Sequence, residues 1–165
     1  MILSLSELVP LVARQREQGR TIALANGCFD LLHVGHVRYL QGAAREADGL
    51  VVAINDDESV RELKGEGRPI LPAPARAEIV DAIRGVSFVV IFSGRTVAPV
   101  IEAIHPDVHC KGTDYTVDNV PEREIVRSYG GRIAIVGDPK DHSTRELVSR
   151  MQRHAAPRRP RKDGT

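Results

Sequence analysis

The sequence has little cysteine, no long apolar run and almost no net charge. Cys28 and Cys110 are its only cysteines, which argues against a disulfide framework and predicts two reduced thiols. No apolar run approaches the roughly 18 residues that a membrane span needs. Ser4, Ser6 and Glu7 stand where a signal peptide would carry basic residues. Together these absences predict a cytoplasmic protein with no membrane partner.

Two nucleotide-binding patterns are also absent. GxGxxG does not follow the first predicted strand, which argues against a nicotinamide-dependent oxidoreductase, and the lack of a Walker A loop argues against a kinase of that class. The formal net charge of +1 neither favours nor excludes nucleic acid as a partner. Basic residues gather in 155–165, but no basic stripe with interspersed aromatics accompanies them in the rest of the chain. We therefore expect no nucleic-acid partner.

Hydrophobic residues make up 42% of the 165 residues, enough for one compact core. Apolar runs predict strands over 21–25, 49–55, 87–92, 106–111 and 132–136, and amphipathic segments predict helices over 4–19, 34–46, 75–84, 96–104, 121–129 and 145–153. This alternation predicts a Rossmann-like α/β fold, with a parallel sheet of about five strands and helices on both faces. We assign one domain to 1–154 and a basic, disordered tail to 155–165.

The stretch 26–40 lies where the first long strand meets a helix. A helix start presents unpaired backbone N–H groups and the positive end of the helix dipole, and both favour anions. His33 and His36 are spaced to share one side of the first turn, and Gly35 leaves room for a phosphate to approach the backbone. Imidazoles at this position could stabilise charge that develops during phosphate chemistry. A two-histidine metal site and a purely structural pair remain alternatives.

Other polar residues follow the second strand. Asn55 and Asp56 end that strand and should lie near the histidine turn, because ligands gather at the carboxyl ends of parallel strands. Lys64 and Arg68 belong to a glycine- and proline-rich segment, 61–74, that could close over phosphates or could be a plain surface loop. Arg76 occupies the first turn of a helix, where it opposes the helix dipole and so hints at an anionic partner.

Two more clusters follow later strands. Lys111 ends one strand and leads into the polar group 112–115, so its ammonium could reach the same site, whereas His109 alternates with apolar neighbours and is interpreted as a packing residue. Ser143 or Thr144 can cap the last predicted helix, and the same position could bind a phosphate.

The segment His33-Val34-Gly35-His36, preceded by Gly27-Cys28-Phe29-Asp30, resembles the HxGH signature of the nucleotidyltransferase superfamily that includes the cytidylyltransferases. Segments 52–60, 63–65 with 68–70, 111–115 and 143–144 are similar to one branch, the heptose 1-phosphate adenylyltransferases that make ADP-heptose for lipopolysaccharide biosynthesis. The similarity covers about 21–151. In this branch the domain can follow a sugar kinase, and this chain resembles the free-standing form. Arg145 stands where the family has the second threonine of Ser-Thr-Thr.

The resemblance implies transfer of AMP from ATP to a sugar 1-phosphate, D-glycero-D-manno-heptose 1-phosphate, with release of pyrophosphate. Mg²⁺ would arrive with the triphosphate, no protein metal ligand is implied, and related enzymes are often homodimers. The catalytic residues implied are His33, His36 and Lys64. The nucleotide-binding residues implied are Gly27, Cys28, Phe29, Asp30, His33, Gly35, His36, Lys111, Gly112, Asp114, Ser143 and Thr144. The acceptor-binding residues implied are Asn55, Asp56, Lys64, Arg68 and Arg76.

Two alternatives remain open beside this interpretation. A cytidylyltransferase that uses CTP and glycerol 3-phosphate, or a similar polyol phosphate, would share the histidine turn. A binding module that has kept the nucleotide pocket and lost transfer would bind nucleotide without turnover.

Overall fold

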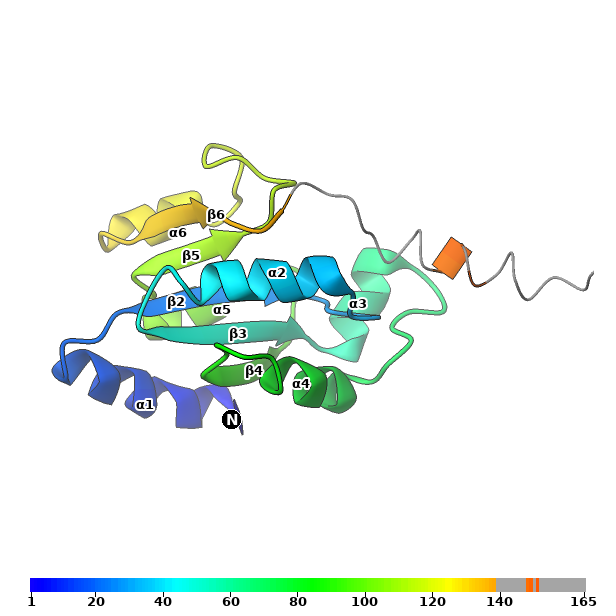
Figure 1. Ribbon diagram of the computed structural model, residues 1–165, viewed down its shortest axis with the longest axis horizontal. Coiled ribbons are helices and arrows are strands. Elements are labelled where there is room, and N and C mark those ends of the chain that lie inside the picture. Colours follow the sequence, from blue (N-terminus) through cyan, green and yellow to red (C-terminus); the bar gives the residue numbers. More distant parts are fainter. Residues whose placement is uncertain (139–147, 150, 152–165) are drawn as a thin grey trace, which may run out of the picture.

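A six-stranded parallel sheet forms the centre of the computed structural model, which describes residues 1–138, 148, 149 and 151. The strand order across the sheet is β1-β4-β3-β2-β5-β6 (Figure 1). The strands are β1 (Ile2–Leu3), β2 (Ile22–Gly27), β3 (Gly49–Asn55), β4 (Phe88–Phe92), β5 (Val108–Lys111) and β6 (Arg132–Ile135). The helices are α1 (Leu5–Glu17), α2 (Val34–Ala43), α3 (Asp57–Lys64), α4 (Ala73–Asp81), α5 (Ala98–Ile104) and α6 (Arg123–Ser128). The predicted parallel α/β fold is confirmed.

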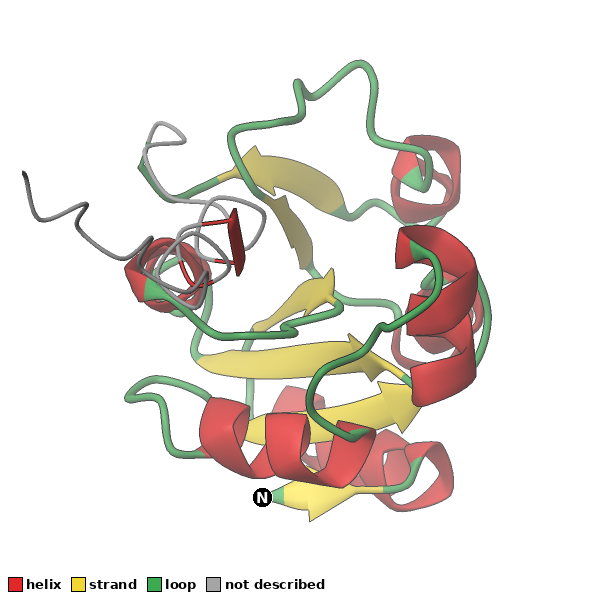
Figure 2. Ribbon diagram, turned by 90° about the vertical axis from the view of Figure 1, so that its right-hand side faces the viewer, coloured by secondary structure: helices red, strands yellow, loops and turns green. Residues whose placement is uncertain are grey.

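Helices cover both faces of the sheet (Figure 2), and the core has two layers, one on each face. Because successive strand residues point to opposite faces, Ala23 and Ala25 of β2 pack toward α2 and α4, whereas Ile22 and Leu24 pack toward α1, α5 and α6. All four of these side chains are fully buried, which explains why the strand sequence is apolar at every position.

Helix α1 begins as its sequence predicts. The Ser4 hydroxyl accepts a hydrogen bond from the Glu7 backbone N–H at 3.3 Å, and the Glu7 carboxylate accepts one from the Ser4 backbone N–H at 2.8 Å. This reciprocal pair satisfies N–H groups that have no partner inside the helix. Ser4 and Glu7 therefore form a capping box at the start of the helix.

Two expectations about the elements need correction. The sheet has a sixth strand, β1, whose two residues pair with β4 and are too few to show a periodic pattern. Helix α3 was not predicted: it lies between the polar end of the second predicted strand and the segment 61–74, and it includes the first residues of that segment. Its signal is the Asp56 cap, which accepts from the Ser59 backbone N–H at 2.8 Å, followed by acidic residues in the first turn. Of the last predicted helix, 145–153, the described residues are Val148, Ser149 and Met151, and these are helical.

The strand order places a topological switch point between β2 and β5. From β2 the chain builds outward through β3 and β4, and later returns to the other side of β2 with β5 and β6. Crevices at the carboxyl ends of strands on either side of such a point are the usual ligand sites of open parallel sheets. Helix α3 and the segment that follows it lie beyond these strand ends (Figure 1). No helix among the described residues combines the length and apolarity that crossing a membrane requires.

Candidate active site

The start of α2 forms one wall of the candidate site. His33 is the N-cap residue and His36 follows in the first turn, with the two ring centroids 3.9 Å apart. The backbone N–H of His33 donates to Nδ1 of His36 at 3.4 Å. Val34 and Gly35 hold the first helical positions, where backbone N–H groups have no acceptor within the helix. The helix start is therefore built to receive an anion.

His36 acts as a neutral hydrogen-bond donor in this environment. Burial, with smaller contributions from the nearby His33 and Lys64, lowers the pKa of His36 to about 4. The ring is thus uncharged near neutral pH. Because Nδ1 accepts from the His33 backbone, the single ring proton resides on Nε2, which is free to donate to a ligand. The imidazole of His36 can therefore contribute a hydrogen bond to a ligand, but not a positive charge.

The turn between β2 and α2 is held in an uncommon backbone conformation. Phe29 and Leu31 have φ values of +48° and +55°, in the left-handed region that side chains other than glycine rarely adopt. The Phe29 ring is buried and packs edge-on against His36, with centroids 5.5 Å apart, and stacks on Tyr39 at 6.4 Å. A Cβ atom on Gly27 would lie 3.2 Å from this ring. Gly27 and Phe29 therefore set the position of the His36 ring.

Asp30 anchors the segment that follows α3. Its carboxylate accepts hydrogen bonds from the backbone N–H groups of Ile70, at 2.9 Å, and Leu71, at 3.2 Å, and forms an ion pair with Arg68. The Asp30 side chain is only 5% exposed, so these contacts are sheltered from water. The sequence suggested that Asp30 binds the nucleotide; in the structure it lines the cavity and holds the loop and Arg68 in place.

A cavity of about 400 Å³ opens between the start of α2 and the end of α3. Its lining combines the histidine turn with the two cations that the sequence analysis singled out. Lys64 is the last residue of α3, which ends at Gly65 with φ +94°, and Arg68 follows in the loop. The lining residues are Asn26, Gly27, Cys28, Phe29, Asp30, His36, Tyr39, Leu63, Lys64 and Arg68. Burial raises the pKa of the Cys28 thiol, so this side chain is not a ready nucleophile.

Arg76 has a different place from the one expected. Its guanidinium is fully buried and donates to the Leu71 carbonyl at 2.9 Å, to the Asp57 carboxylate at 2.7 Å and to the Cys28 carbonyl. The expected acceptor contact is therefore corrected, because these internal partners account for the charge and no surface of the side chain remains for a substrate. Arg76 instead joins α4, α3 and the histidine turn.

Asn55 and Asp56 are likewise engaged by structural hydrogen bonds. The Asn55 amide is buried, donates to the Gly94 carbonyl at 3.1 Å and lies 3.8 Å from the Cys28 sulfur. Asp56 caps α3 and accepts from the Ser93 hydroxyl. These contacts shape the carboxyl end of β3 and give both side chains internal partners, and a contact of Asn55 or Asp56 with the acceptor stays a prediction.

Lys111 also faces inward. Its side chain is 8% exposed, and the ammonium donates to Oδ1 of Asn26 at 2.9 Å and lies 3.4 Å from the Glu122 carboxylate. Lys111 is not among the residues that line the cavity, but its partner Asn26 is, and the sequence did not single out Asn26 as a site residue. Its signal was its position at the end of a strand directly before Gly27. Gly112 and Asp114 follow Lys111 in a loop at the same end of the sheet.

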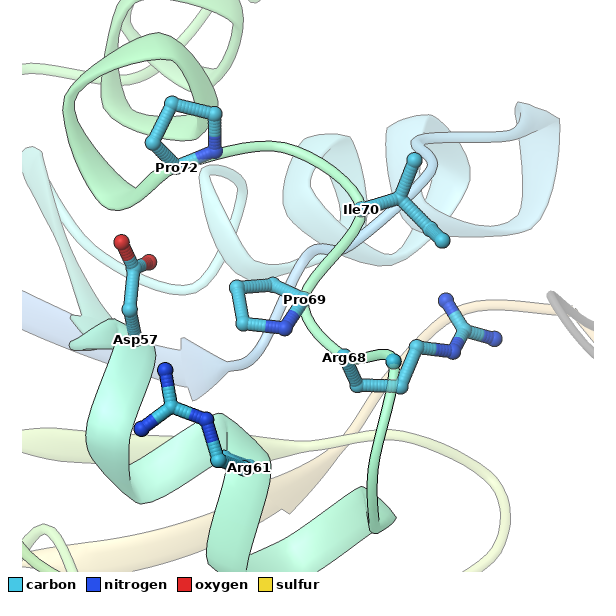
Figure 3. Close-up of a pocket in the computed structure, with 7 residues that line it drawn as sticks. Asp57, Arg61, Arg68, Pro69, Ile70 and Pro72 are labelled. Carbon is cyan, nitrogen blue, oxygen red and sulfur yellow. The ribbon is translucent and has the colours of Figure 1, made fainter.

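A second cavity, of about 420 Å³, lies on the other side of the 65–72 segment. Figure 3 shows Asp57 and Arg61 on α3 facing Pro69 and Pro72, while the Arg68 guanidinium is turned away from Asp57. Arg61 is exposed and was not singled out from the sequence. Arg68 therefore lines both cavities, and its guanidinium points away from the Asp57 side of the second.

The described residues contain no group of three or more His, Cys, Asp or Glu side chains placed to hold a metal ion. The pair of His33 and His36 thus has no further protein ligand within this part of the chain. Ser143 and Thr144, which were expected to bind the nucleotide, lie outside the described residues, as does Arg145.

Comparison with known proteins agrees with this geometry. A family model described as cytidylyltransferase-like matches residues 24–149. The bifunctional protein HldE of Alcanivorax borkumensis is 44% identical over 151 residues, which are 92% of this chain and 32% of the relative. The protein of the same name from Koribacter versatilis is 49% identical over 149 residues, 90% of this chain and 31% of the relative. The chain thus spans about a third of the length of these relatives.

A solved structure shares the fold. It is the lipopolysaccharide core biosynthesis protein from Thermoplasma volcanium, which superimposes with a TM-score of 0.62 at 26% identity and covers 74% of this chain and 100% of its own. The histidine turn that forms the wall of the cavity lies within the residues matched by the family model. The chain belongs to the cytidylyltransferase-like family of nucleotidyltransferases.

Proposed function

We propose that this enzyme transfers AMP from ATP to a sugar 1-phosphate, D-glycero-D-manno-heptose 1-phosphate, and releases pyrophosphate. The observation that carries the transfer chemistry is that His36 at the start of α2, Lys64 and Arg68 line one cavity. The sugar phosphate is supported by the resemblance of segments 52–60, 63–65 with 68–70, and 111–115 to heptose 1-phosphate adenylyltransferases. It is supported further by a structural neighbour described as a lipopolysaccharide core biosynthesis protein.

In this reaction a phosphate oxygen of the acceptor attacks the α-phosphorus of ATP. A new phosphorus–oxygen bond forms, the bond from the α-phosphorus to the bridging oxygen of the β-phosphate breaks, and pyrophosphate leaves with that oxygen. The attacking oxygen is already anionic, so the chain needs to supply neither a nucleophile nor a general base. Catalysis then depends on positioning and on stabilising negative charge.

The cavity residues fit these two tasks. The backbone N–H groups at the start of α2 and the Nε2 proton of His36 would donate to phosphate oxygens as charge moves onto them. His33 would support this by holding His36 in the correct tautomer through its backbone. Lys64 is a mobile point charge at a helix end, whereas Arg68 is fixed by Asp30. Together they would neutralise the triphosphate.

Mg²⁺ fits this site as a companion of the triphosphate. The Asp30 carboxylate that lines the cavity is bound to Arg68 and to two backbone N–H groups, so phosphate oxygens and water would be its ligands. When bound, the ion would neutralise phosphate charge.

The family description points to cytidylyl transfer, so ATP and CTP are the two nucleotides to compare. Pyrophosphate release with Mg²⁺ therefore tests ATP and CTP, each with D-glycero-D-manno-heptose 1-phosphate and with glycerol 3-phosphate. Release with ATP and the heptose phosphate alone supports the proposal. Release with CTP and glycerol 3-phosphate replaces it with the cytidylyltransferase. Nucleotide binding without release in any combination would indicate a binding module.

A further inference from the structure

A buried polar network lies under the nucleotide cavity, at the switch point between β2 and β5. Oδ1 of Asn26, at the end of β2, lies 2.9 Å from the Lys111 ammonium and 3.2 Å from Nε2 of His109, both on β5. Glu122 completes the network from the start of α6, 3.4 Å from Lys111. His109 is fully buried, and Lys111 and Glu122 are 6% and 5% exposed. Within this network, Asn26 is the residue that also lines the cavity.

The donors and acceptors of this network permit one arrangement. A lysine ammonium only donates, so the Asn26 atom that faces Lys111 is the carbonyl oxygen and not the amide nitrogen. Since the same oxygen faces His109, Nε2 of that ring must carry its proton and donate. The ring is neutral, because burial and, to a smaller extent, Lys111 lower its pKa to about 3. The Asn26 carbonyl therefore receives two donors, and its NH₂ group is turned away from them.

The remaining polar groups of the cavity indicate what this NH₂ group meets. It makes no hydrogen bond to any other described residue, and Asn26 lines the same cavity as His36, Lys64 and Arg68. In the states described above these three side chains offer hydrogen-bond donors, and two of them are cations. The carboxylate of Asp30 also lines the cavity, but Arg68 and two backbone N–H groups already bind it. Donors that converge from several sides suit an anionic group rich in acceptors, such as a phosphate chain.

The network is costly as a purely structural device. Nδ1 of His109 is buried and makes no hydrogen bond within the described residues, and the buried Oε2 of Glu122 meets Lys111 at 3.4 Å as an ion pair without hydrogen-bond geometry. Buried ion pairs are often no more stabilising than apolar side chains of similar size, and unpaired buried acceptors lower stability. A set of polar residues that weakens the core, while fixing one amide at the edge of a cavity, indicates a role in binding.

We propose that Asn26 binds a phosphate oxygen of the nucleoside triphosphate through its NH₂ group, and that Lys111 and His109 are positioning residues that fix the orientation of this amide. The inference rests on the proposed function only in that the cavity must bind a nucleoside triphosphate. It gives Lys111, which was expected to touch the nucleotide, an indirect role through Asn26.

The test is Asn26→Asp, which keeps the shape of the side chain and replaces its donor by a negatively charged acceptor. Isothermal titration with ATP and Mg²⁺, in the absence of acceptor, should show affinity reduced by about 10- to 100-fold. Asn119→Asp is the matched control, because it makes the same charge change at an exposed residue whose carbonyl oxygen accepts from Thr116. This control should bind ATP as the wild type does.

The positioning role is tested by Lys111→Met combined with Glu122→Gln, which removes the ion pair without leaving an isolated buried charge. ATP affinity should fall by about 3- to 10-fold, because His109 still holds the amide in part. In the wild type, the Asn26 side-chain amide resonances, identified by their loss in Asn26→Asp, should shift when inorganic tripolyphosphate binds. A purely structural network would leave those resonances unmoved.

The outcomes separate this inference from the proposed function. If wild type binds ATP and Asn26→Asp binds it within twofold, the inference is wrong while the transferase proposal stands. If Asn26→Asp weakens ATP but not tripolyphosphate, the amide contacts the base or ribose and the phosphate assignment is overturned. If wild type binds neither ATP nor CTP, both proposals fail. Weakened binding of both ATP and tripolyphosphate supports the inference even if another acceptor proves to be the substrate.

Discussion

Replacing Arg76 by methionine should destabilise the protein without removing a substrate contact. The guanidinium is fully buried and has three partners, the Asp57 carboxylate and the carbonyl oxygens of Leu71 and Cys28. Methionine fills much of the same volume but offers no donor. Breaking a buried ion pair costs roughly 3–5 kcal/mol. The Asp57 side chain is 40% exposed and water can solvate it, so we expect the lower end, about 3 kcal/mol, mostly from the two carbonyls.

Urea denaturation followed by circular dichroism measures this loss. Arg84→Met is the matched control, because Arg84 is exposed, and it should change the free energy of unfolding by less than about 0.5 kcal/mol. The reasoning is refuted if Arg76→Met lowers the free energy of unfolding by less than about 1 kcal/mol while the KM for the sugar phosphate rises strongly. That result would mean that the arginine faces the acceptor, as the sequence first suggested.

Three further predictions concern the site and the core. His36→Ala should lower kcat by about 100-fold or more, because it removes a donor aimed at the phosphates, and should leave the circular dichroism spectrum unchanged; unaltered turnover in pyrophosphate release would contradict this. Burial lowers the pKa of His109 to about 3, against 6.5 for an unperturbed imidazole, so between these pH values the unfolded chain binds more protons than the folded one. The free energy of unfolding should therefore fall as the pH drops below 6.5, by at most about 1.4 kcal/mol per pH unit for this ring. Urea titrations of wild type and His109→Gln should show a shallower decline in the variant, and equal slopes would exclude His109 as the cause. Gly27→Ala should reduce kcat/KM by about tenfold, because the new methyl group must displace the Phe29 ring that packs on His36; steady-state kinetics equal to wild type would show that the ring adapts freely.

Local sequence determined the elements and the histidine turn. Uninterrupted apolar runs such as 49–55 predict strands buried on both faces, and β3 is buried at every position. Ser4 and Glu7 fix the start of α1 through contacts between residues three apart. His33, Gly35 and His36 share one helical turn, so their proximity follows from chain geometry alone. Features that depend on a few neighbouring residues could therefore be predicted from the sequence. Helix α3 is an exception: its Asp56 cap and acidic first turn were present in the sequence but were interpreted as strand end and loop.

The tertiary structure decided what the charged residues do. Arg76, Lys111 and Asp30 all looked like ligand contacts, but each meets partners that are distant in the sequence, Cys28, Asn26 and Arg68. A charge near a strand end can equally face a substrate or an internal partner, and only the packing of remote segments distinguishes the two. The strand order, with β5 beside β2, is what brings Asn26 together with His109 and Lys111. No periodicity within the chain encodes that pairing, because it depends on how whole elements pack against one another.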